Sequence, residues 1–154
     1  MALPQMKDSD IISAMIARFS AITAGADYNY TYDNIDDKFP QAGAALEDGE
    51  GKNININQSF EENLGELSQG NQVLQDVKMT VEINLLGAGS SADIRKMKAD
   101  IMKSIGEDLT WGGNAFYTKF ISAQYNKKDI YEHKISDLTI TIEVQYRQYA
   151  WAIQ

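Results

Sequence analysis

Apolar residues recur at helical spacing near the start of the chain. Between Asp8 and Thr23 they form a single stripe that consists of Ile11, Ile12, Met15, Ile16, Phe19 and Ile22. A stripe with this period is typical of an amphipathic helix that packs one face on a core. Ser9 is the expected N-cap, because its hydroxyl can accept a hydrogen bond from a free amide, and Gly25 is the expected stop.

A second stripe of the same period runs from Ala92 to Ile105 and consists of Ile94, Met97, Ile101 and Ile105. Lysines and an arginine occupy other positions around this helix, as on a solvated face. Ser90 or Ser91 is the expected N-cap, and Gly106 is the expected end of the helix.

Elsewhere apolar positions alternate with polar ones, which is the period of a β-strand. The strictest alternation lies in Val77–Leu85 and Leu138–Arg147. Shorter or less regular runs predict further strands at Tyr28–Tyr32, Asn53–Asn57 and Ala115–Tyr125. Strands with one apolar and one polar face are typical of antiparallel sheets that are solvated on one side.

The predicted order is a helix, three or four strands, a helix and two strands, which is α-β-β-β-β-α-β-β with the larger count. Two polar segments, Gly43–Lys52 and Glu61–Gly70, lie between strands and are expected to be mobile in the free protein. We therefore predict an α+β fold in which two α-helices pack on one mostly antiparallel or mixed β-sheet. The length of 154 residues fits a single domain over positions 1–154.

The last residues break the alternation of the final strand. Its apolar positions are even-numbered, whereas Tyr149, Trp151 and Ile153 are odd-numbered. A flat strand cannot bury both sets on one face, so either a bulge near Arg147-Gln148 restores the face or the chain leaves the sheet. The three side chains then dock either on the chain's own core or on a neighbouring subunit, for which they are the candidate interface residues.

The charge of the chain argues against nucleic acid as a tight ligand. Fourteen basic residues are scattered among 22 acidic ones, for a net charge of −8, whereas phosphate binding needs clustered lysine and arginine. No apolar run approaches the ~18 residues of a membrane span, and the start lacks the apolar segment of a signal peptide. We therefore expect a cytoplasmic protein without membrane contact. Cysteine is absent, which excludes disulfides and thiolate chemistry.

Residues that can carry catalysis or hold a metal are scarce. His133 is the only histidine and sits in a charged segment, so neither a Ser-His-Asp triad nor a zinc site with several histidines can be assembled. Asp33–Asp37 is acidic, but Ile35 stands where a calcium loop needs an oxygen ligand, and Lys38 stands where it needs glycine. We therefore expect a turn at Asp33–Asp37 and no metal site.

The sequence Gly87–Ala92 matches the G-x-G-x-x-A pattern of a dinucleotide-binding turn between a strand and a helix. The preceding strand alternates, however, whereas a Rossmann strand is buried on both faces, and no second βαβ unit follows. We favour a plain turn with a serine cap and expect no cofactor. Tyr28, Tyr30 and Tyr32 can form a ligand platform, but packing in a core or an interface is the simpler interpretation.

Because no pair of acids stands out either, we predict no catalytic, cofactor-binding or metal-binding residue, and we interpret the chain as a structural or assembly protein rather than an enzyme.

The order of these elements resembles the tail-terminator, or tail-completion, family of tailed bacteriophages. The matching features are the helix Asp10–Ile22, the strand Tyr28–Tyr32, the Phe39-Pro40 step, the strand Val77–Leu85, the helix Ala92–Ile105 and the closing strand Leu138–Arg147. The segment Gly49–Gly70 is longer than the family pattern.

The resemblance implies a ring, usually of six subunits, on the head-proximal end of the tail tube. Such a ring stops tube polymerisation and joins the tail to the head, so its partners are its own copies, the tail-tube protein and a head–tail connector protein. It also implies a place in the virion, and in the host cytoplasm during assembly. A ring subunit needs head-to-tail contacts that close and no catalytic group. An acidic lining suits a lumen through which DNA passes without binding.

Three alternatives remain open at the level of sequence. Another phage component, such as a tail-tube, connector or stopper subunit, is the nearest, and a non-phage adaptor or inhibitor domain comes next. An enzyme ranks last. Each alternative has its own test. The mass and location of an assembled ring identify another phage component, and monomeric behaviour at high concentration favours an adaptor domain. Stabilisation by nucleotides indicates an enzyme.

Overall fold

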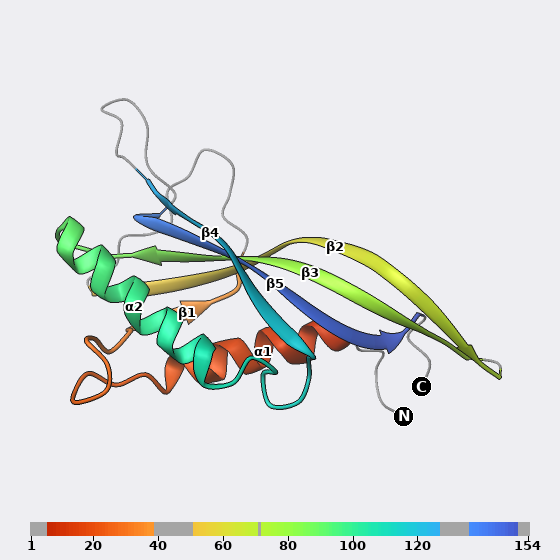
Figure 1. Cartoon of the computed structure of the whole chain (residues 1–154). Coiled ribbons are helices and arrows are strands. Elements are labelled where there is room, and N and C mark those ends of the chain that lie inside the picture. Colours follow the sequence, from red (N-terminus) through yellow and green to blue (C-terminus); the bar gives the residue numbers. More distant parts are fainter. Residues whose placement is uncertain (1–5, 39–50, 71, 127–135, 151–154) are drawn as a thin grey trace.

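The structure, a computed structural model, describes residues 6–38, 51–70, 72–126 and 136–150. In these ranges two helices pack on a five-stranded sheet (Figure 1). The elements are α1 (Lys7–Ser20), β1 (Asn34–Asp36), β2 (Asn53–Gln69), β3 (Gln72–Leu86), α2 (Ser91–Glu107), β4 (Tyr117–Tyr125) and β5 (Leu138–Tyr149). The predicted α+β fold is confirmed, and three described strands precede α2.

The sheet has the order β1-β2-β3-β5-β4, and it is mixed because β1 runs parallel to β2 whereas the other neighbours are antiparallel. The two most regular strands of the sequence, β3 and β5, pair at its centre, with Val77 opposite Tyr146 and Leu85 opposite Leu138. This register places the alternating apolar residues of both strands on one face, which we call the core face. The opposite face is called the open face.

Both helices pack on the core face. Ile11, Met15 and Phe19 of α1 and Met97 and Ile101 of α2 are fully buried against the apolar residues of the central strands. Each such side chain contributes about 1.5–3 kcal/mol when it is removed from water. The two predicted stripes are therefore confirmed as the helix surfaces that form the core.

Both predicted ends of α1 are wrong. The helix begins at Lys7 after Met6, and Ser9 makes no cap but donates its amide to the Asp8 carboxylate over 2.8 Å. It ends at Ser20, well before Gly25, because the next two amides bond to carbonyl oxygens three residues back and tighten the last turn. Ile22 remains 2% exposed, so it reaches the core from outside the helix.

The start of α2 is confirmed, and its end is not. The Ser90 hydroxyl accepts a hydrogen bond from the Asp93 amide over 3.2 Å, as an N-cap does. Gly106 lies inside the last turn, and the helix continues to Glu107 before Asp108 turns extended. Gly106 does not adopt the left-handed conformation that ends many helices.

Tyr28–Tyr32 is not a strand, contrary to the prediction. The segment runs along α2, and its three tyrosine hydroxyls each bond to a carboxylate of that helix: Tyr28 to Glu107 over 2.8 Å, Tyr30 to Asp93 over 2.9 Å and Tyr32 to Asp100 over 3.1 Å. These acids are seven residues apart and therefore share one side of the helix. The interpretation of the tyrosines as packing residues is confirmed, since Tyr32 is buried and the other two pack against the core.

The chain enters the sheet a few residues later, where we expected a turn. Asn34–Asp36 forms the short strand β1, parallel to Asn53–Asn55 of β2. The Asp36 carboxylate accepts from the Asn55 side chain over 2.8 Å, which holds the two strands together. Three residues are too few for alternation to show in a sequence.

Strand β2 is much longer than predicted, because it includes Glu61–Gln69, which we interpreted as a polar connecting segment. Two register shifts explain the difference, one between Gln58 and Phe60 and one between Asn63 and Gly65. Each bulge inserts a residue and reverses which positions face the core. The resulting hairpin runs out past the helices (Figure 1). We call its outer part, residues 59–69 of β2 and 72–76 of β3, the arm. In the other predicted mobile segment, residues 43–50 lie outside the described residues.

Candidate assembly surface

The glycine-rich turn after β3 packs against the protein itself. Gly87 has a φ of +89°, and a side chain there would overlap the carbonyl oxygen of Gly51. The Ala88 amide donates to the Asp137 carboxylate over 3.0 Å. In a dinucleotide site the glycines let a pyrophosphate approach the backbone. Here the close approach is to the chain's own backbone, which accounts for the glycine without a ligand.

The acidic segment considered for calcium has protein partners. The Asp33 carboxylate accepts from the Lys52 amide over 3.1 Å, and Asp36 holds Asn55 as described above. Within the described ranges no group of three or more His, Cys, Asp or Glu side chains is placed to hold a metal ion. His133 lies outside the described residues.

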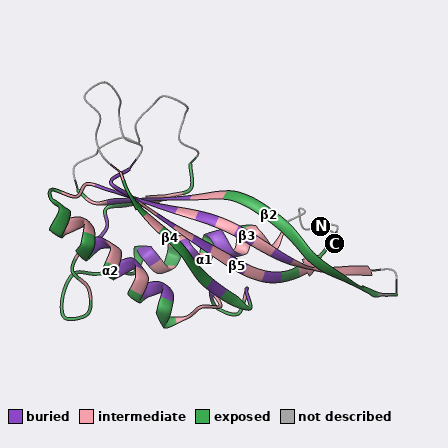
Figure 2. Ribbon diagram, turned by 45° about the horizontal axis from the view of Figure 1, so that its top comes forward, coloured by how far each residue is buried: buried purple, intermediate pink, exposed green. Residues whose placement is uncertain are grey.

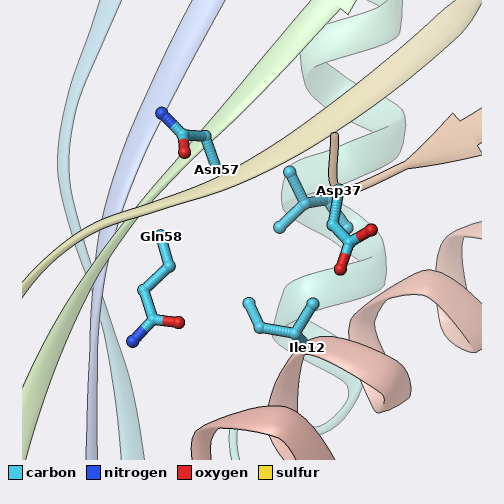
Figure 3. Close-up of a pocket in the computed structure, with 5 residues that line it drawn as sticks. Ile12, Asp37, Asn57 and Gln58 are labelled. Atoms are coloured by element: carbon cyan, nitrogen blue, oxygen red, sulfur yellow. The ribbon is translucent and has the colours of Figure 1, made fainter. Parts of the chain in front are cut away.

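Two shallow pockets, each of about 140 Å³, lie beside α1. One is lined by Ile12 of α1, Asp37 after β1 and residues of β2 (Figure 3): Ile56, Asn57 and Gln58. Pockets that bind small molecules are usually about 300–1,000 Å³. Neither pocket is large enough to indicate a ligand site.

The turn that leads into β4 is tightly held. Asp108 accepts from the Thr110 hydroxyl and amide and from the Gly112 amide, and these hydrogen bonds, with the Arg18 guanidinium 3.1 Å away, lower its pKa to about 2. Trp111 adopts a φ of +52° and is fully buried, with its indole N–H donating to the Thr118 hydroxyl over 2.8 Å. Sequence reasoning missed this cluster, which fixes where β4 begins.

Large apolar side chains are exposed along the outer edge of the arm. Phe60, Leu64 and Leu67 of β2 are 57%, 48% and 51% exposed. Strand β1 pairs only with Asn53–Asn55, so among the described residues nothing pairs with β2 on this side from Gln58 outward. We call residues 59–69 of β2 the arm edge. An exposed edge with large apolar residues is suited to contact with another chain.

A second exposed edge lies on the other side of the sheet. Strand β4 pairs with β5 alone within the described chain, which leaves its outer side open. We call residues 117–125 the β4 edge, and it is exposed over most of its length (Figure 2). Its exposed large apolar residues are Tyr117, Phe120, Ile121 and Tyr125, and Phe116 precedes them. The predicted strand Ala115–Tyr125 is confirmed, and its poorly distinguished faces reflect this edge position.

The open face between the two edges is polar and carries ion pairs. Lys78 lies 3.2 Å from Glu62 and 3.6 Å from Glu143, and its pKa is raised chiefly by the hydrogen bond to Glu62. Arg147 bonds to Asp76 over 2.8 Å and lowers the pKa of that carboxyl. The side chains in these pairs are between 21% and 50% exposed, which indicates a face in partial contact with solvent. Ion pairs in contact with solvent contribute little to stability.

The candidate interface residue Tyr149 lies on this open face. Strand β5 runs to Tyr149 opposite Leu74 of β3 without a register shift, so the alternative of a bulge near Arg147-Gln148 is wrong. Tyr149 is 45% exposed, whereas Tyr146, of the other parity, is fully buried and donates to Glu61 over 2.7 Å. Trp151 and Ile153 lie outside the described residues.

The fold and the two exposed edges define a class: a helix-backed mixed sheet with surfaces suited to contact with other chains. In the described part of the chain, neither helix is long and apolar enough to cross a membrane. No family model matches the sequence, and no curated protein sequence matches it either.

Among solved structures, the fold is similar to a sheath/tube terminator of PVC, an extracellular contractile injection system, determined by cryo-EM in the extended state. The TM-score is 0.60 at 14% sequence identity, and the match covers 97% of this chain. The chain spans 58% of the length of that protein. The likeness concerns the fold, and it agrees with the terminator fold that the order of elements in the sequence resembles.

Proposed function

We propose that this chain is a terminator subunit of a phage tail or a related tubular particle. Six copies form a ring on the head-proximal end of the tail tube, stop its polymerisation and join it to the head–tail connector. The protein works in the virion, after assembly in the host cytoplasm, and performs no catalysis.

The observation that carries this proposal is the fold likeness to a sheath/tube terminator over 97% of the chain. Two further features support it. The chain offers exposed apolar surface on two edges of one sheet, and a ring subunit needs such contacts and no catalytic group. Its net charge of −8 repels DNA, which suits a ring through which DNA passes without binding.

The full chain at concentrations from micromolar to millimolar, measured by native mass spectrometry, should give a species of six times the 17.2 kDa chain mass. When the tube protein of the same particle is polymerised with the chain, electron microscopy should show shorter tubes with capped ends. A chain that is monomeric at millimolar concentration and leaves tube length unchanged contradicts the proposal. Binding along the sides of tubes favours a different tail component.

A further inference from the structure

We infer that the arm edge of one copy docks on the β4 edge of the next copy, and that this is the contact that builds the ring. The inference rests on the proposed function and specifies its interface. The sheet order β1-β2-β3-β5-β4 puts the two edges on opposite sides of one sheet. Each edge has a partner strand on its inner side only, among the residues that the structure describes.

The position of the edges determines what kind of assembly they make. Two different surfaces on opposite sides of a subunit form a head-to-tail contact, which leaves one surface free at each end and gives a ring where the rotation between copies closes and an open filament where it does not. Contact between two identical edges would instead stop at a dimer. The arrangement in this chain therefore permits the head-to-tail contact that the proposed ring needs.

Both edges carry the apolar side chains that such a contact would bury. The exposed fractions run from 41% for Ile121 to 57% for Phe60. Aromatic residues are frequent anchors of protein interfaces, and the β4 edge has three of them, Tyr117, Phe120 and Tyr125.

The charges of the two edges are complementary. The arm edge carries Glu61, Glu62 and Glu66 and has no basic residue between positions 58 and 69. Within the subunit Glu61 accepts from Tyr146 and Glu62 pairs with Lys78, and the edge remains acidic. The β4 edge carries Lys119 and no acid, and Lys98 of the neighbouring helix α2 lies 5.8 Å from the ring centre of Tyr125. Contact between two arm edges would bring acids together, whereas contact between an arm edge and a β4 edge pairs opposite charges. This difference selects a second copy of the chain in head-to-tail orientation as the occupant.

Bulges make the two edges selective. The shifts in β2 and the shift in β4 between Phe120 and Ser122 divide each edge into short straight runs. Such irregularities hinder indiscriminate strand pairing. The side chains then decide which partner an edge accepts.

Two double variants test the contact, each with acidic residues in place of apolar ones. The arm variant is Phe60→Glu with Leu67→Glu, and the β4 variant is Phe120→Glu with Ile121→Glu. A control with the same added charge, Ser13→Glu with Ala17→Glu, changes two exposed positions of α1 that belong to neither edge. Circular dichroism and thermal melting establish that each variant folds, and serine replaces glutamate at any position that unfolds the chain.

Native mass spectrometry should show wild type and control assembling beyond dimers, and each edge variant alone as a monomer with at least 100-fold weaker association. An equimolar mixture of the two edge variants retains one intact arm edge and one intact β4 edge. It should form a heterodimer and nothing larger. If wild type assembles only on tube ends, the same variants should lose tube capping.

Edge variants that assemble or cap tubes as the control does overturn the inference and leave the proposed terminator function standing. Homodimers of a single edge variant also overturn it, because the contact is then not head-to-tail. A wild-type chain that neither assembles nor caps tubes overturns the proposed function itself.

Discussion

Gly87 has a positive φ and lies against the backbone of Gly51, so a side chain does not fit there. We expect Gly87→Ala to lower the free energy of unfolding by about 2 kcal/mol or more, because it adds a steric overlap to a strained backbone conformation. Urea unfolding measures the change. Gly25→Ala is the matched control, since no atom lies within 4 Å of the added carbon and φ is ordinary there. It should change stability by less than about 1 kcal/mol. Equal losses of stability from the two substitutions contradict the conclusion that a side chain does not fit at Gly87.

Asp108 should make part of the stability depend on pH. Its pKa is lowered from 3.8 to about 2 in the folded chain, chiefly by the hydrogen bonds from Thr110 and Gly112. Because the folded state holds the proton less tightly than the unfolded state, the contribution is complete above about pH 4 and is lost as the pH falls towards 2.

We therefore expect Asp108→Asn to lower the melting temperature at pH 6, with a difference from wild type that shrinks between pH 4 and pH 2. Asp27→Asn is the control, because that side chain is 83% exposed and its ion pair to Lys103 is long, at 3.8 Å. It should differ little from wild type at any pH. A difference for Asp108→Asn that is constant from pH 6 to pH 2 contradicts the expectation.

At the scale of elements, the residues predicted well are those whose environment is regular. The stripes of α1 and α2 and the alternation of Val77–Leu85 and Leu138–Arg147 all face one core, so their periods are visible in the sequence. The arm was missed because two bulges reverse the parity of β2, which hides a continuous strand behind polar residues.

The strand predicted at Tyr28–Tyr32 is wrong for a different reason. Its period of two comes from contacts with α2, where Asp93, Asp100 and Glu107 accept the tyrosine hydroxyls, and not from a sheet. The seven-residue spacing of these acids was a signal available in the sequence, but nothing in a sequence indicates which segment such acids meet. The arm edge and the β4 edge were likewise not predictable, since the exposure of a strand depends on which strands lie outermost in the sheet.

The arm should open more readily than the body of the sheet. It extends past the helices, and its β2 residues from Phe60 to Ser68 are exposed. We expect amide hydrogens of residues 61–70 in the free protein to exchange at least tenfold faster than those of residues 79–85 in β3. Hydrogen–deuterium exchange measures both segments in one experiment. Equal protection of the two segments would show that the arm is as stable as the core.

At the scale of the whole molecule, charge is unevenly distributed. Five of the 14 basic residues and three acids lie on α2 and β4, whereas the outer part of β2 carries acids and no base. The net charge of the whole chain therefore does not describe its two edges, because the arm edge carries acids and no base whereas the β4 edge carries one lysine and no acid. In the proposed ring, this difference favours one relative orientation of two approaching copies.

Removal of Tyr149–Gln154 tests how the end of β5 is used. Tyr146 is the last buried apolar residue of this strand, and Tyr149 lies on the open face opposite Leu74 of the arm. We therefore expect the truncated monomer to keep its fold and, because the arm loses part of its neighbouring strand, to lose assembly. Thermal melting and native mass spectrometry measure the two effects. Tyr149→Ala separates the contribution of this residue from that of Trp151 and Ile153. An unfolded truncated monomer supports docking on the chain's own core, and a truncation without either effect excludes both.

The insertion of β5 between β3 and β4 has a consequence for synthesis on the ribosome. The hairpin of β2 and β3 and the strand β4 all precede β5 in the chain, yet β3 and β4 each need β5 as a neighbour. Until β5 has emerged, the nascent chain therefore exposes two strand edges that the finished fold covers, and such edges are prone to aggregate. A chain stalled before Leu138 can pair β2 with β3 and so form the arm, but it cannot add β4 to the sheet.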